Sequence, residues 1–107
     1  MSALELDAVL GEIAGDLEGA TTTRLGVGFE VSAGGIVVGV VAGGVAELRL
    51  RPAVASAALR TPDVAASGRG PGWIRFAPAT VDDFALDRAV AWLESAVRLA
   101  TEESPKQ

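Results

Sequence analysis

The chain has 107 residues, of which 50% are hydrophobic and 21% charged, and its formal net charge is −5. This length fits a single domain, 1–107, with a core over about residues 3–100 and a frayed polar tail at 101–107. The sequence has no cysteine, histidine or tyrosine. Disulfides, Cys/His zinc sites and histidine-activated nucleophiles are therefore excluded, and we expect no metal, no cofactor and no catalytic residue.

The acidic balance makes nucleic acid an unfavourable partner, because DNA and RNA binders usually carry a basic stripe. The longest uncharged run, residues 31–46, is shorter than the ~20 apolar residues that span a bilayer. Glu5 and Asp7 stand where a signal peptide would carry basic residues. We expect a cytoplasmic protein with no membrane partner.

The first predicted element is a helix over residues 3–18. Leu6, Leu10, Ile13 and Leu17 recur at steps of four, three and four, which places them on one helical face. A glycine at position 19 is a typical helix stop.

Three strands are predicted next, over residues 24–31, 36–41 and 45–51. Apolar residues alternate with small or polar ones in the first, and the second is a β-branched run. Glycine-rich turns separate the strands, so we expect an antiparallel meander.

The second half of the chain predicts a short helix over 52–60, a loop over 61–72 and a strand over 73–77. A long helix follows, for which Thr80 and Asp83 suggest a capping-box start. The order α-β-β-β-α-β-α predicts an α+β two-layer sandwich, with an antiparallel sheet of about four strands covered on one face by helices.

The stretch "SGRGPGWIRF", residues 67–76, has the glycines of a phosphate-binding loop. Such a loop needs a lysine and a following helix, whereas these glycines precede a predicted strand. We therefore interpret the stretch as a turn that leads into a strand.

The candidate ligand-binding residues are arginines and one tryptophan. They alternate outward on the strands predicted at 45–51 and 73–77, or lie in the loop before the second strand, and are Arg49, Arg51, Arg69, Trp73 and Arg75. If the two strands are neighbours, these side chains form a surface for a small anion or for nucleic acid. The alternative is a solvated sheet face in which the arginines pair with Glu47 and its neighbours.

Two further features have simple structural explanations. Asp82 and Asp83 suit the first turn of a helix better than acid–base chemistry or Mg²⁺ binding, because adjacent helical residues point in different directions. Trp92 lies at the margin of a wide apolar arc on the last helix. It can pack internally or anchor a homodimer through that helix.

The run from Ala46 to Ala100 combines "ELRLRP", "GRGPGWIRF" and "DD" with a long helix that contains Trp92. In this it resembles the small bacterial "luciferase domain" family of uncharacterised proteins and, more distantly, YjbR/MmcQ-like domains. The resemblance implies a compact α+β domain, and for the YjbR-like group a possible role in DNA binding. It supplies no agreed catalytic residues.

Three functions follow as hypotheses. The first is a non-enzymatic binding or assembly domain that forms a homodimer. The second is a binder of an anionic ligand or nucleic acid through the arginine-bearing face. The third is an enzyme that works with arginines and carboxylates alone, through electrostatic stabilisation.

Overall fold

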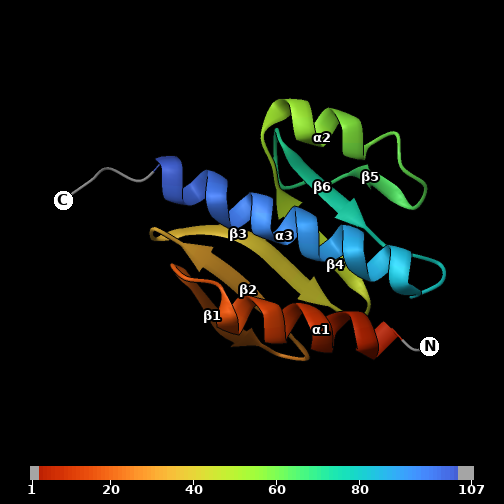
Figure 1. The fold of residues 1–107 in the computed structure, drawn as a ribbon, viewed down its shortest axis with the longest axis horizontal. Helices are drawn as coiled ribbons and strands as arrows, with labels where there is room; N and C mark the ends of the chain where they lie inside the picture. The colour runs from red at the N-terminus through yellow and green to blue at the C-terminus, as the bar shows by residue number, and fades with distance from the viewer. Residues whose placement is uncertain (1–2, 104–107) are drawn as a thin grey trace.

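The structure is a computed structural model that describes residues 3–103 (Figure 1). Its helices and strands follow the order α-β-β-β-β-α-β-β-α. They are α1 (Ala3–Asp16), β1 (Ala20–Leu25), β2 (Gly28–Ala33), β3 (Ile36–Ala42), β4 (Val45–Arg49), α2 (Pro52–Ala58), β5 (Val64–Ala66), β6 (Trp73–Phe76) and α3 (Asp83–Glu103).

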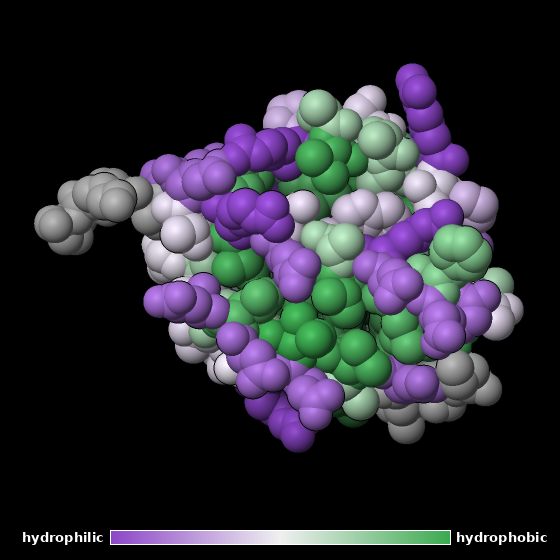
Figure 2. All heavy atoms as spheres, in the orientation of Figure 1, coloured by the Kyte–Doolittle hydropathy of each residue, from purple (hydrophilic) through white to green (hydrophobic). Residues whose placement is uncertain are grey.

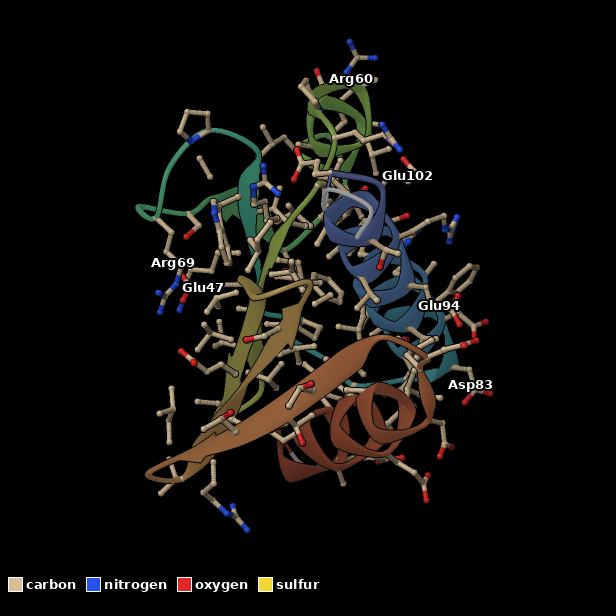
Figure 3. The ribbon with its side chains drawn as sticks, turned by 90° about the vertical axis from the view of Figure 1, so that its left-hand side faces the viewer. Glu47, Arg60, Arg69, Asp83, Glu94 and Glu102 are labelled. Atoms are coloured by element: carbon tan, nitrogen blue, oxygen red, sulfur yellow. The ribbon has the colours of Figure 1, made fainter. Side chains whose placement is uncertain are left out.

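The strands form one six-stranded antiparallel sheet in the order β1-β2-β3-β4-β6-β5. Helices α1 and α3 lie side by side against one face of this sheet, and α2 packs beside β6. In the view of Figure 3 the labelled side chains of Glu47 and Arg69 lie on the opposite, open side. The predicted α+β class and antiparallel sheet are confirmed, whereas the predicted number of strands is wrong.

The strand predicted over residues 24–31 is in fact a hairpin. Gly26 and Val27 form a two-residue turn between β1 and β2, with Leu25 opposite Gly28. Gly26 has φ of 58°, the value that a type II′ turn needs at its first central position. The alternation of Leu25, Val27 and Phe29 suggested a continuous strand because the turn itself contains an apolar residue. The three threonines before it are half of the six residues of β1.

The second missed strand is β5, in the region predicted as a loop over 61–72. Its three residues pair with β6, so that Ala65 lies opposite Arg75. A run this short has too few residues for alternation to be recognised in the sequence. The glycine-rich stretch after β5 leads directly into β6, as predicted.

The start of the last helix also differs from the prediction. Asp82, rather than Thr80, caps α3: its Oδ1 accepts a hydrogen bond from the Ala85 N–H at 2.9 Å. At the other end the helix continues through Glu103, so residues 101–103 of the predicted frayed tail are helical. Residues 104–107 lie outside the described part of the chain.

The core fills the space between the sheet and its two covering helices. Helix α1 contributes the predicted stripe, with Leu6 and Leu10 fully buried, while Leu93 does the same from α3. From the sheet, Leu48 and Phe76 face them. This packing needs a close approach between β2 and β3, since a Cβ at Gly28 would lie 2.2 Å from the Val41 carbonyl oxygen.

We therefore expect Gly28→Ala to lower the free energy of unfolding by about 2 kcal/mol or more, because the backbone of β3 would have to move. Gly15→Ala is the matched control. Nothing lies within 4 Å of a Cβ at that helical position, and alanine there should raise stability by up to ~1 kcal/mol. Urea denaturation of both variants measures the difference. Equal stability of the two variants would contradict the tight β2–β3 contact.

Candidate functional site

The two strands that carry the predicted arginine surface are neighbours. Strands β4 and β6 pair antiparallel, so that Glu47 lies opposite Arg75 and Arg49 opposite Trp73. The five candidate residues nevertheless divide into two groups with different partners. Arg69, Trp73 and Arg75 gather around Glu47, whereas Arg49 and Arg51 bind the end of α3.

Glu47 is the centre of the first group. Its Oε2 accepts a hydrogen bond from the Ser67 hydroxyl at 2.8 Å, and its Oε1 accepts one from Arg69 Nε at 2.9 Å. The Ser67 oxygen also accepts from the Arg69 backbone N–H at 3.2 Å. The Arg69 guanidinium lies 5.8 Å from the centre of the Trp73 ring, a cation–π distance. The loop between β5 and β6 is thereby fastened to β4.

Opposing effects set the protonation of Glu47. Burial alone would raise the pKa of the Glu47 carboxyl, but it is outweighed by the hydrogen bonds from Ser67 and Arg69 and by the charges of Arg69 and Arg75. The net effect holds the pKa below its ordinary value, so the carboxylate stays ionised at neutral pH. A carboxylate held in this state is a structural anchor rather than a proton donor.

The second group neutralises the C-terminal end of α3. Arg49 donates to both carboxylate oxygens of Glu103, at 2.7 and 3.1 Å, and Arg51 forms an ion pair with Glu102. The hydrogen bond to Glu103 raises the pKa of Arg49 despite partial burial, and the same bond lowers the pKa of Glu103. Two acids at the negative end of a helix dipole are unfavourable, and α3 has no basic residue in its last turn. The missing cations come from Arg49 of β4 and from Arg51, which lies beyond the end of the strand, at the start of α2, rather than on it as predicted.

The aspartate pair and Trp92 have structural roles in the fold. Asp82 caps α3, and Asp83 begins that helix. The Trp92 ring packs edge-on against Phe76, with ring centres 5.1 Å apart and planes at 89°. Within residues 3–103 no group of three or more His, Cys, Asp or Glu side chains is placed to hold a metal ion.

Clefts lie elsewhere on the molecule. One of about 450 Å³ separates α1 from the β1–β2 hairpin and is lined by Gly11, Arg24 and Phe29, among others. A second, of about 250 Å³, lies beside the start of α3, and a third, of about 350 Å³, lies between the ends of α1 and α3. Glu47, Arg49 and Glu103, whose pKa values are shifted, line none of the three.

The two edges of the sheet differ in protection. Edge strand β5 has three residues, a length that limits pairing with another chain. Edge strand β1 has six, of which five are exposed, and it contains no proline and no lysine. Leu25 and Val27, at its end, are 47% and 87% exposed. Long exposed edges are normally blocked by charges, prolines or covering segments, because their free N–H and C=O groups pair with other strands.

The free groups of β1 follow from its hairpin. Residues that flank a two-residue turn exchange hydrogen bonds, so Leu25, Thr23 and Thr21 direct their backbone groups toward β2. Thr22 and Arg24 then direct theirs toward the open edge. In agreement with this alternation, the Ala20 N–H points away from β2 and donates to the Leu17 carbonyl at 3.2 Å. Neither Thr22 nor Arg24 has an additional backbone partner within residues 3–103.

Neither the role of Ser67 nor the β1 edge was predicted from the sequence. Ser67 is 8% exposed, and its bond to Glu47 depends on the unrecognised pairing of β5 with β6. The three consecutive threonines were the available signal for an additional strand, because β-branched residues favour strands. The alternative in which the arginines pair with Glu47 is confirmed for Arg69.

Comparison with known proteins finds no matching family model, no matching curated protein and no matching solved structure. The similarity to the "luciferase domain" and YjbR-like groups therefore stays a prediction. Within the described residues, no helix has both the length and the apolar character needed to cross a bilayer.

We expect Glu47→Gln to lower stability at neutral pH by about 1 kcal/mol, because the charge-assisted bonds to Ser67 and Arg69 weaken. The folded pKa is depressed, so this stabilisation is complete above the ordinary glutamate pKa and is lost as pH falls through the lower folded value. The difference between variant and wild type should therefore vanish in acid.

Urea denaturation at neutral and acidic pH measures that difference. Glu30→Gln, on strand β2 of the same sheet, is the control, because Glu30 forms no ion pair within residues 3–103. A loss of stability that is equal for the two variants, or independent of pH, would contradict the anchoring role of Glu47.

Proposed function

We propose that the chain is a non-enzymatic assembly domain that forms a homodimer by pairing its sheet edges at β1. The observation that carries the proposal is the unprotected edge itself: a six-residue, threonine-rich strand with exposed Leu25 and Val27 at its end. An edge of this kind is a template for strand addition, in which main-chain hydrogen bonds supply much of the affinity. A second copy always has the same free edge to offer.

The last helix is the other surface for a dimer. Figure 2, which views the helix side, shows apolar side chains gathered in the middle of that face and bordered by hydrophilic ones. Leu86 and Val90 of α3 are half-buried there and pack against the core. Trp92 is engaged with Phe76. We favour β1 because the outward backbone groups of Thr22 and Arg24 have no backbone partner within residues 3–103, whereas Leu86, Val90 and Trp92 of α3 already pack within the chain.

An enzymatic role has less support. The shifted pKa values belong to ion-paired groups outside the clefts, and the charged pairs of Arg49, Arg51 and Arg69 hold structural elements together. Breaking these pairs to bind a substrate would cost the interactions that position the loop and the helix end.

Sedimentation velocity from micromolar to millimolar concentration tests the proposal. We expect the mass to rise from 10.8 kDa toward twice that value, with a weak affinity because one strand pair buries little surface. Thr22→Pro should keep the protein monomeric, since it removes an N–H that faces the free edge. Ala66→Pro is the control: it removes an N–H that faces the free edge of β5, at the other side of the sheet, and should leave dimerisation intact. A constant monomer mass at the highest concentration would overturn the proposal.

A second candidate function is anion binding at Arg75. This side chain is exposed, forms no ion pair within residues 3–103, and alternates onto the same face as Trp73. A guanidinium beside an indole suits a phosphate attached to a flat ring.

Thermal-shift measurements with phosphate and nucleotides address this candidate. We expect stabilisation that is lost in Arg75→Ala and retained in Arg60→Ala, a control at an exposed position beyond α2. For nucleic acid, the affinity should also fall steeply as salt rises. An identical response of the two variants would exclude Arg75 as the binding residue.

A further inference from the structure

We infer that Arg24 recognises the acidic C-terminal end of α1 on a second copy of the chain and thereby fixes the register of β1 pairing. This inference rests on the proposed homodimer and names the residues that select the partner. Its starting point is a difference between the two long helices. Both end in acidic residues without a basic residue in the last turn. Among residues 3–103, however, ion-paired cations are found at the end of α3 and not at the end of α1.

The end of α1 carries Asp16 and Glu18, both exposed. Neither forms an ion pair within residues 3–103, although Arg98 lines the same cleft as Glu18. Two carboxylates beside the negative end of a helix dipole repel its carbonyl groups, and a cation placed there is stabilising. The end of α1 is therefore an anionic site that the single chain leaves without an ion-paired cation.

Arg24 lies in the same part of the molecule and forms no ion pair with any residue between 3 and 103. Its side chain lines the cleft between β1 and α1, which places it on the helix side of the sheet. Asp7 and Glu12 line that cleft too, but neither pairs with Arg24. The Asp7 carboxylate instead accepts a hydrogen bond from the Gly44 N–H at 2.9 Å. Arg24 is thus free to contact a second chain.

Symmetry restricts how two β1 strands can pair. A twofold axis perpendicular to the sheet places the helix sides of both copies on the same side of the joined sheet. Residues that lie opposite each other in the two β1 strands must therefore point to the same side. The axis then passes through a residue, and only an axis at Thr22 or at Thr23 pairs five of the six residues of β1. With the axis at Thr23, the two Arg24 residues are two positions apart on one face, about 7 Å along the strand, and repel each other.

With the axis at Thr22, the two Arg24 residues are four positions apart, about 14 Å, and each lies opposite Ala20 of the second copy. The two Thr22 residues exchange backbone hydrogen bonds, and the Arg24 N–H donates to the Ala20 carbonyl of the second copy. Ala20 is held against the end of α1 by its bond to the Leu17 carbonyl. Since α1 lies on the helix side, Arg24 reaches the end that carries Asp16 and Glu18.

Cysteine cross-linking tests the register directly, because the chain has no cysteine of its own. With the axis at Thr22, the two Cα atoms there are about 5.5 Å apart, within the range that a disulfide bridges. Thr22→Cys should form a disulfide-linked dimer under mild oxidation, and Thr23→Cys should form much less. The opposite preference would overturn the inferred register while leaving the homodimer in place.

Charge reversal tests the recognition. We expect Arg24→Glu and Glu18→Arg each to weaken dimerisation about tenfold at low salt, and the double variant to recover most of the loss. Arg60→Glu changes the net charge equally at a distant exposed site and should have little effect. Sedimentation velocity measures the affinity, and circular dichroism confirms folding. A wild-type dimer that Arg24→Glu leaves unchanged would overturn the inference alone, whereas a wild-type monomer would refute the proposed function.

Discussion

The fold depends on the burial of one face of a six-stranded sheet beneath α1 and α3. Leu6, Leu10 and Leu93 fill the space above Leu48 and Phe76, and this apolar contact is the main stabilising term available to a chain without cysteine. Helices α1 and α3 cover one face of the sheet and leave the second face without a covering layer. The same packing therefore leaves the other face open and two edges to be protected by other means.

The open face is stabilised by charge pairs rather than by a second layer. Glu47 accepts hydrogen bonds from Ser67 and Arg69, which lie in the loop that joins β5 to β6. The short edge strand β5 is therefore held by these side-chain bonds as well as by its pairing with β6. At the other edge, no side-chain hydrogen bond or ion pair within residues 3–103 holds β1, whose exposed residues are three threonines, Arg24 and Leu25. The sheet thus has one protected edge and one unprotected edge, and β1 is the edge that can pair with a strand of another chain.

Periodicity in the sequence was sufficient to predict the two long helices, the strands β3, β4 and β6, and the side of β6 that Ile74 and Phe76 bury. It failed where a turn or a strand was shorter than the pattern needed to recognise it. Val27 continues the apolar alternation through a turn, and β5 is too short to show any. The partners of the candidate residues could not be predicted, because Ser67 reaches Glu47, and Glu102 and Glu103 reach Arg51 and Arg49, only through tertiary contacts.

Electrostatics connects the fold to the proposed assembly. The end of α3 is acidic, and Arg49 and Arg51 neutralise it within the chain, so the helix can extend to Glu103 despite its charge. The end of α1 presents the same unfavourable combination of carboxylates and helix dipole without such a partner. A guanidinium supplied by a neighbouring copy would relieve it, and Arg24 lies on the strand whose edge is free to bring that copy close. Strand pairing would then supply affinity, while the charge contact would decide which of the two symmetric registers forms.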